Sequence, residues 1–212
     1  MDVLLIGATG GTGAHLLRLL LADGHQVRAM VRREEQADEV RAAGATPVLA
    51  DLEGELDDAV AGVDAVCFCA GSGSSTGPDK TLLVDLHGAV RTVDACRAHG
   101  VRRYLMLSSM AAGAPERGPE AIRHYLAAKH AADRILMDSG LDWTVVRPGG
   151  LTDDDPTGRV AVGVPHLGER GSIPRADVAA VMAACLEDSR THGAVFELVS
   201  GDVPVAEVAA QV

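Results

Sequence analysis

The chain has 212 residues, which is enough for one domain with a substantial core and too few for two large domains. Its net charge of −11 argues against a nucleic acid or an anionic membrane as partner, and no apolar stretch approaches the roughly 20 residues of a membrane span. Aromatic residues make up only 2% of a chain that is 47% apolar, so Ala, Val and Leu must build the core.

The chain begins with a short apolar run at residues 2–6, which leads directly into a glycine-rich segment and then a leucine-rich helix signal. A buried strand, a glycine turn and a helix N-terminus are the parts that hold a dinucleotide pyrophosphate. Gly7 would allow the tight turn, Gly10 the close approach of phosphate, and Gly13 close packing of the helix on the strand. An ordinary tight connection is the alternative. The residues predicted to bind the cofactor here are Gly7, Thr9, Gly10, Gly11, Thr12 and Gly13.

Strand and helix signals alternate along the rest of the chain, which favours a parallel sheet covered by helices on both faces. Further strands are predicted at 26–31, 47–50, 64–69, 103–107, 143–146 and 194–199. Helices are predicted at 34–43, 56–63, 82–100, 120–139 and 174–187, the third with Leu82, Leu83, Leu86, Val90 and Val93 at helical spacing. Residues 150–172 have no strong period and are expected to form a small substrate lobe or lid. We therefore predict a single doubly wound α/β domain over residues 1–212.

The end of the second predicted strand indicates which dinucleotide binds. In such folds this position meets the adenosine ribose, about 20 residues after the glycines. An acidic residue there would bind the ribose hydroxyls of NAD, but here Arg32 and Arg33 follow the strand. Two guanidinium groups can hold a 2′-phosphate, so NADP is favoured over NAD, although both arginines can simply be solvated. Asp51 and Leu52 are placed at the adenine edge, where Asp51 can equally cap a helix.

Small and polar residues follow the later strands, at the sheet edge where open parallel sheets bind ligands. Tyr125 and Lys129 lie four residues apart, hence on one face of the predicted helix 120–139. An ammonium beside a phenol would lower its pKa from about 10, so Tyr125 is predicted as general acid and Lys129 as its modulator and ribose ligand. A surface pair has the same spacing. The strand-end residues expected to face the nicotinamide half are Ala70, Gly71, Ser72, Ser108, Ser109 and Pro148.

Together these motifs resemble the short-chain dehydrogenase/reductase superfamily, specifically its small atypical NAD(P)-binding branch, over nearly the whole chain. The resemblance rests mainly on the glycine motif, Tyr125-x-x-x-Lys129 and the Val-Arg-Pro-Gly segment at 146–149. It implies a Rossmann fold, a nicotinamide cofactor, and oxidoreductase or epimerase-type chemistry with Tyr125 as the acid–base group. It also implies that Pro148 lies over the nicotinamide and that Asp177 ties down the lobe. Asp85 stands where larger relatives carry a catalytic-relay asparagine, which leaves the proton relay open.

The sequence therefore predicts an NADP-dependent reductase of a small carbonyl-like or conjugated substrate, with Ser108 or Ser109 orienting the carbonyl. Two alternatives stay open, a flavin- or tetrapyrrole-type reductase and a non-catalytic NADP-binding redox sensor that acts through a partner protein. No metal site is expected, because the four cysteines and the aspartates at 153–155 lack ligand spacing. A cytoplasmic protein without signal peptide is expected, and helices 82–100 and 120–139 could form a homodimer seam or simply pack in the core.

Overall fold

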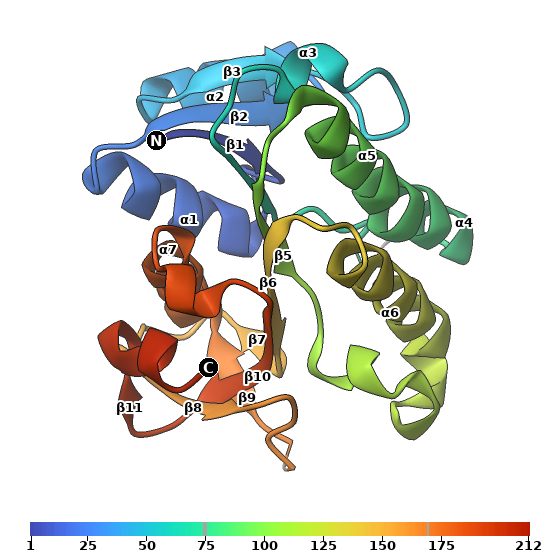
Figure 1. The fold of residues 1–212 in the computed structure, drawn as a ribbon, viewed down its shortest axis with the longest axis vertical. Coiled ribbons are helices and arrows are strands. Elements are labelled where there is room, and N and C mark those ends of the chain that lie inside the picture. The colour runs from blue at the N-terminus through green and yellow to red at the C-terminus, as the bar shows by residue number, and fades with distance from the viewer. Residues whose placement is uncertain (74–75, 169) are drawn as a thin grey trace.

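The computed structural model describes residues 1–73, 76–168 and 170–212, and it shows one large sheet with helices on both faces (Figure 1). The strands of this sheet are β1 (Asp2–Ile6), β2 (Gln26–Val31), β3 (Thr46–Leu49), β4 (Ala65–Phe68), β5 (Arg103–Leu107), β6 (Asp142–Pro148), β8 (Arg159–Gly163), β10 (Ala194–Ser200) and β11 (Val203–Pro204). They lie in the order β11-β8-β10-β6-β5-β4-β1-β2-β3. All neighbours from β10 to β3 pair in parallel, and β8 pairs antiparallel with β10 and β11. The predicted doubly wound Rossmann sheet is confirmed.

Two layers of helices enclose the sheet. The helices are α1 (Gly11–Ala22), α2 (Glu34–Ala42), α3 (Asp57–Val60), α4 (Pro78–Lys80), α5 (Ala89–His99), α6 (Arg123–Met137) and α7 (Arg175–Leu186). α1 and α7 pack together on one face, and α5 and α6 cover the other (Figure 1). In the described part of the chain, no helix has both the length and the apolarity needed to cross a bilayer.

β1 lies at the centre of the sheet, and its side chains explain why. Val3 and Leu5 belong to the core beneath α1 and α7, whereas Leu4 and Ile6 belong to the core on the opposite face. A strand buried on both faces needs a continuous apolar run, which residues 2–6 supply. The order of strands reverses at β1, since β2 and β3 are added on one side of it and β4 pairs on the other. The carboxyl end of β1 is therefore the topological switch point at which such sheets bind ligands.

The helix predicted from residue 82 differs from expectation in its first half. α4 is followed by a π-helix, Thr81–Gly88, before regular α-helical geometry begins in α5. The wider turn brings Val84 and Asp85 to the interior and leaves Leu82 56% and Leu83 38% exposed. An apolar stripe at α-helical spacing does not stay on one face through a π-helix. These two leucines are therefore not core residues, and the homodimer seam stays a prediction.

Residues 150–172 contain strands that the sequence pattern did not indicate. β8 joins the main sheet, while β7 (Gly150–Thr152) and β9 (Ser172–Pro174) form a separate two-stranded parallel sheet. These strands have three to five residues, which is too short to show a clear alternation in the sequence. Part of the expected substrate lobe is thus an extension of the domain sheet.

Asp177, in the first turn of α7, ties this segment to the helix. Its carboxylate is buried and accepts hydrogen bonds from the amide N–H groups of Thr157 and Gly158, both at 2.9 Å, and from the Thr157 hydroxyl. The negative charge also lies at the helix end where the backbone dipole favours it. The structural role predicted for Asp177 is confirmed.

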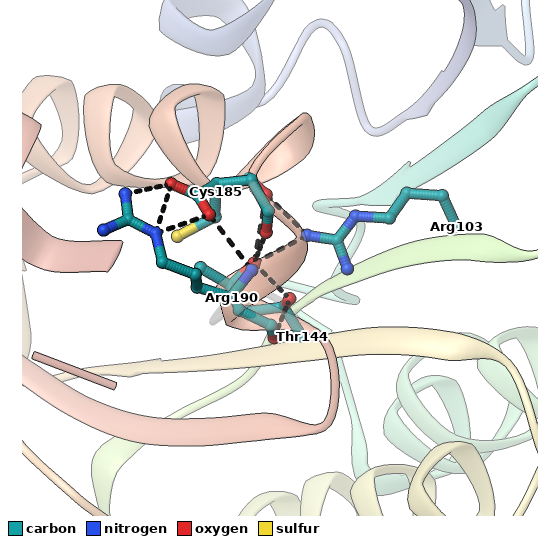
Figure 2. A network of polar contacts seen from close by, with 6 residues as sticks. Arg103, Thr144, Cys185 and Arg190 are labelled. Carbon is teal, nitrogen blue, oxygen red and sulfur yellow. Dashed lines mark hydrogen bonds and ion pairs between the residues drawn. The ribbon is translucent and has the colours of Figure 1, made fainter. Parts of the chain in front are cut away.

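The other end of α7 is held by a buried arginine from β5 (Figure 2). Arg103 donates to the carbonyl oxygens of Leu186 and Cys185 at 2.9 and 2.6 Å, and to the Thr191 hydroxyl at 3.0 Å. The Thr144 hydroxyl donates in turn to the Thr191 carbonyl. Burial lowers the pKa of the Arg103 guanidinium. The last carbonyl groups of a helix receive no N–H donor from within the helix, and the Arg103 guanidinium provides donors for two of them.

Candidate cofactor and active site

The glycine turn between β1 and α1 is built as its spacing predicts. Gly7 has φ +89°, a left-handed conformation that favours glycine, and a Cβ atom on it would lie 2.7 Å from the Ala70 nitrogen. A Cβ on Gly13 would lie 2.0 Å from the Gly7 carbonyl oxygen. Gly10 closes the turn, since its N–H donates to the same oxygen at 3.0 Å. The first and third glycines therefore serve the close packing of α1 on the strand ends.

The N-terminus of α1 fits a phosphate group. Gly10 and Gly11 are exposed and present bare backbone, whereas Thr12 is buried. Within the described residues, no side chain caps this helix and its first turn carries no acidic residue. Free N–H groups and the positive end of the helix dipole together favour an anion. The turn thus has the geometry and the charge to hold a dinucleotide pyrophosphate.

Arg32 and Arg33 lie exposed at the carboxyl end of β2. Arg33 makes a loose ion pair with Glu35 at 4.0 Å, with its side chain 67% exposed. Gln36 connects this strand end to the glycine turn, because its Oε1 accepts from the Arg32 N–H and its Nε2 donates to the Thr9 hydroxyl at 3.0 Å. Sequence analysis did not predict this role of Gln36. The only indication was that a polar residue stands in the first turn of α2, close to the end of β2. The two guanidinium groups are accessible to a 2′-phosphate.

Asp51 and Leu52 take different places after β3. Asp51 is exposed, and its Oδ1 accepts from the Glu53 N–H at 3.0 Å, so it caps a turn and not a helix. Leu52 is 5% exposed and packs on Gly88, where a Cβ would lie 2.9 Å from the leucine Cβ. Of the two, only the side chain of Asp51 is open to a bound adenosine.

One face of α6 carries three ionisable groups one turn apart, Tyr125, Lys129 and Asp133. The Lys129 side chain is 1% exposed, and its ammonium donates to the Leu107 carbonyl at 2.7 Å, at the end of β5. The Asp133 carboxylate is fully buried. Positions i, i+4 and i+8 share a helix face, so Asp133 extends the predicted pair by one turn. Sequence reasoning missed it, although the same spacing indicated it.

Asp133 joins the strand ends to α6. Its Oδ2 accepts from the Ser108 hydroxyl at 2.8 Å and from Arg147 Nε at 2.9 Å. Burial raises the pKa of Asp133, while the nearby Arg147 and Lys129 charges oppose the shift. Burial likewise lowers the pKa of Lys129, against the Asp133 and Asp85 carboxylates. These groups form one buried network of alternating charge.

Tyr125 departs from the expected electrostatics. Its pKa is raised, first by burial and then by the Asp85 and Asp133 carboxylates. Without cofactor, Lys129 is not among the groups that set this pKa, because its ammonium is buried against the Leu107 carbonyl while two carboxylates act on the phenol. The lowering expected from Lys129 together with a bound nicotinamide stays a prediction. The contact of Lys129 with a ribose stays a prediction.

The two serines after β5 have different surroundings. Ser108 is 5% exposed, and its hydroxyl is oriented by Asp133. Ser109 is partly exposed and caps the 3₁₀ turn Met110–Gly113, with its carbonyl accepting from the Ala112 N–H. Only Ser108 is connected to the charged network. Pro148, buried at the end of β6, adjoins this network through Arg147.

Asp85 of the π-helix fixes the end of β4. Its Oδ2 accepts from the Ser72 N–H at 3.0 Å, and a Cβ on Gly71 would lie 3.1 Å from its Oδ1. Among the described residues, Oδ1 of Asp85 and Oδ1 of Asp133 are buried oxygens without a hydrogen-bond partner. Buried acceptors are rarely left unpaired, and π-helices concentrate at functional sites. Both carboxylates also raise the pKa of the Tyr125 phenol by their charge, so the two unpaired oxygens belong to the electrostatic surroundings of Tyr125.

Comparisons with known proteins agree with this geometry. Residues 7–189 match a family described as NAD(P)H-binding. A Bacillus subtilis protein described as an uncharacterized sugar epimerase is 47% identical over 98% of both chains. A Bacillus halodurans structure, provisionally named an NAD-dependent epimerase/dehydratase, is 46% identical with a TM-score of 0.97 over 100% of both chains. An oxidoreductase from Lactococcus lactis is 28% identical, with a TM-score of 0.90 over 100% of this chain and 96% of that one. The chain therefore belongs to the NAD(P)H-binding family of Rossmann-fold proteins and is similar to the atypical short-chain dehydrogenases/reductases.

Proposed function

We propose that this protein is an NADP-dependent reductase that acts on a small carbonyl-like or conjugated substrate at the carboxyl ends of β4, β5 and β6. One observation carries the proposal. Tyr125, Lys129 and Asp133 share a face of α6, and Asp133 binds Ser108 at the end of β5, two strands from β1 and its glycine turn. A nicotinamide bound along this edge would supply the hydride.

The residues at the adenosine end support NADP in preference to NAD. Arg32 and Arg33 are exposed at the strand end where an acidic residue would favour NAD. The guanidinium geometry matches a phosphate bidentately, and each charge-assisted hydrogen bond is stronger than a neutral one. Gln36 links this strand end to the glycine turn, so the proposed sites for the 2′-phosphate and for the pyrophosphate are held in fixed positions by the same side chain.

Tyr125 is the proton donor in this proposal. Like any phenol with a pKa well above 7, it carries a proton at neutral pH that it can donate to a substrate oxygen. Ser108 has a hydroxyl fixed by Asp133, and Arg147 holds that carboxylate from the other side. In this assignment Tyr125 is the acid, and Ser108 and Lys129 keep the site organised around it.

A second candidate, a redox sensor that binds NADP and acts through a partner protein, is favoured by a different observation. The Ser108 hydroxyl and the Lys129 ammonium are both bonded to internal acceptors, at 2.8 and 2.7 Å. Such groups stabilise the site without acting on a ligand. A sensor would bind NADPH and leave it unoxidised.

The test is the loss of NADPH absorbance at 340 nm with a panel of aldehydes, ketones, enones, flavins and linear tetrapyrroles. With an accepted carbonyl, Tyr125→Phe should lower kcat about a hundredfold or more. Tyr104→Phe is the matched control, because Tyr104 is the other tyrosine, lies on β5 and is fully buried in the core. Unchanged turnover of a flavin or tetrapyrrole by Tyr125→Phe would move the assignment to that type of reductase. Tight NADPH binding without turnover of any panel member would favour the sensor.

A further inference from the structure

Arg175, the first residue of α7, lies on the glycine turn. A Cβ atom added to Gly11 would lie 2.6 Å from Arg175 Cδ and 2.8 Å from its Nε. α7 packs along α1, so its first residue reaches the N-terminus of the neighbouring helix. The arginine side chain is 27% exposed. A guanidinium thus covers part of the surface that fits a pyrophosphate.

The two-stranded sheet supplies this arginine with a carboxylate. β7 and β9 pair in parallel with Thr152 opposite Pro174, so the next residues along, Asp153 and Arg175, come together. Arg175 Nη1 donates to Asp153 Oδ1 at 2.7 Å. The Asp153 side chain is 87% exposed, and exposed ion pairs of this kind contribute little. The carboxylate is therefore a replaceable partner.

The charges around the glycine turn explain why the arginine needs an anion. The α1 N-terminus carries the positive end of its dipole, and within the described residues its first turn holds no acidic side chain. A second cation at this point is favourable only with a negative group beside it. Asp153 supplies one charge, whereas a pyrophosphate would bind the guanidinium and the helix end together.

We propose that Arg175 is a further cofactor-binding residue, whose guanidinium binds the pyrophosphate of NADPH over the Gly10–Gly11 backbone and exchanges it for Asp153 when the cofactor leaves. The inference rests on the proposed NADP site, and it adds to that site a binding residue from the C-terminal third of the chain. Asp153 then acts as a competitor of the cofactor. Its removal should strengthen binding, which a merely structural ion pair would not do.

The experiment measures NADPH dissociation constants by calorimetry for the wild type, Arg175→Ala, Arg175→Lys and Asp153→Asn. Arg175→Ala should weaken binding about tenfold or more, and Arg175→Lys less, because lysine keeps the charge but not the fork. Asp153→Asn should strengthen binding about twofold to fivefold, as loss of a weak exposed competitor predicts. In the Arg175→Ala background the same aspartate change should have no effect.

Two controls separate the phosphate sites. Arg190→Ala removes a similar exposed Arg–Asp pair at the other end of α7 and should leave the dissociation constant unchanged. Adenosine 2′-monophosphate, which lacks the pyrophosphate, should bind Arg175→Ala as it binds the wild type. Equal NADPH affinity in the wild type, Arg175→Ala and Asp153→Asn would overturn the inference and leave the proposed function standing. A wild type that binds neither NADPH nor NADH would overturn both.

Discussion

Replacing single glycines of the turn should separate its structural role from its binding role. In Gly13→Ala the new methyl group would lie 2.0 Å from the Gly7 carbonyl oxygen and 2.8 Å from its carbonyl carbon. Both atoms are backbone, so no side-chain rotation relieves the overlap and α1 must move off the strand. Overpacking of this kind costs about 1–3 kcal/mol, against about 1 kcal/mol gained from the helix propensity of alanine. We expect a net loss in the free energy of unfolding near the upper end of the resulting range, about 2 kcal/mol, because the 2.0 Å approach is to a backbone oxygen.

Gly10→Ala is the matched variant within the same turn. Gly10 has φ −79° and ψ 165°, which alanine adopts freely, and the nearest atom to its added Cβ would be 3.2 Å away. The methyl group would occupy exposed surface at the helix N-terminus, where the phosphate is expected. This variant should lose less stability than Gly13→Ala, because its closest approach is 3.2 Å in place of 2.0 Å, and it should lose NADPH affinity.

Urea unfolding followed by circular dichroism, with calorimetry of NADPH binding, tests both variants. Equal m-values would show that the comparison reflects stability alone. The packing argument fails if Gly13→Ala unfolds at the urea concentration of the wild type, and the binding argument fails if Gly10→Ala binds NADPH unchanged.

Three further predictions concern charge. Replacing Arg32 and Arg33 by alanine should weaken the binding of NADPH about tenfold or more and leave the binding of NADH unchanged. Competition binding measures both affinities. Arg103→Met should lower the free energy of unfolding by about 3 kcal/mol, because it removes three buried hydrogen bonds that contribute about 1 kcal/mol each; chemical denaturation measures this. The pKa of Asp188 is lowered to about 2 by its hydrogen bonds from Arg190, so its contribution to stability is present above the ordinary carboxyl pKa near 4 and is lost as pH falls through 2. Asp188→Asn should abolish that part of the acid dependence.

These predictions have distinct controls. If the binding of NADH weakens as much as that of NADPH, the two arginines attract the nucleotide by their general charge and do not bind a 2′-phosphate. Arg102→Ala, which removes an exposed pair with Asp142 beside Arg103, should change stability little, and an equal loss in both variants would contradict the capping argument. An unchanged acid profile in Asp188→Asn would contradict the third.

The N-terminal half of the site was predictable because its requirements are local. A strand buried on both faces, a turn needing positive φ at Gly7, and a helix beginning at Gly11 each leave a mark within a few residues. The same holds for the alternation of strands and helices that defined the fold. Arg32 and Arg33 could be placed at a strand end for the same reason.

The buried network was not predictable, because its members are distant in sequence. Asp133 resembles any helical aspartate until Ser108 and Arg147 are brought to it by β5 and β6. The pKa of Tyr125 could not be anticipated either, since its direction depends on burial and on the π-helix that turns Asp85 inward. Arg175 meets the glycine turn only through the packing of α7 on α1.

The amide of Gln36 has a practical consequence for redesign. Its amide group binds both the Thr9 hydroxyl of the glycine turn and the backbone N–H of Arg32, the first arginine of the pair. If Arg32 and Arg33 select the nucleotide as proposed, they can be exchanged while Gln36 is retained to hold the loop in place. Replacing Gln36 would loosen the glycine turn and the Arg32 backbone together. A change in nucleotide selectivity could then not be assigned to either of them.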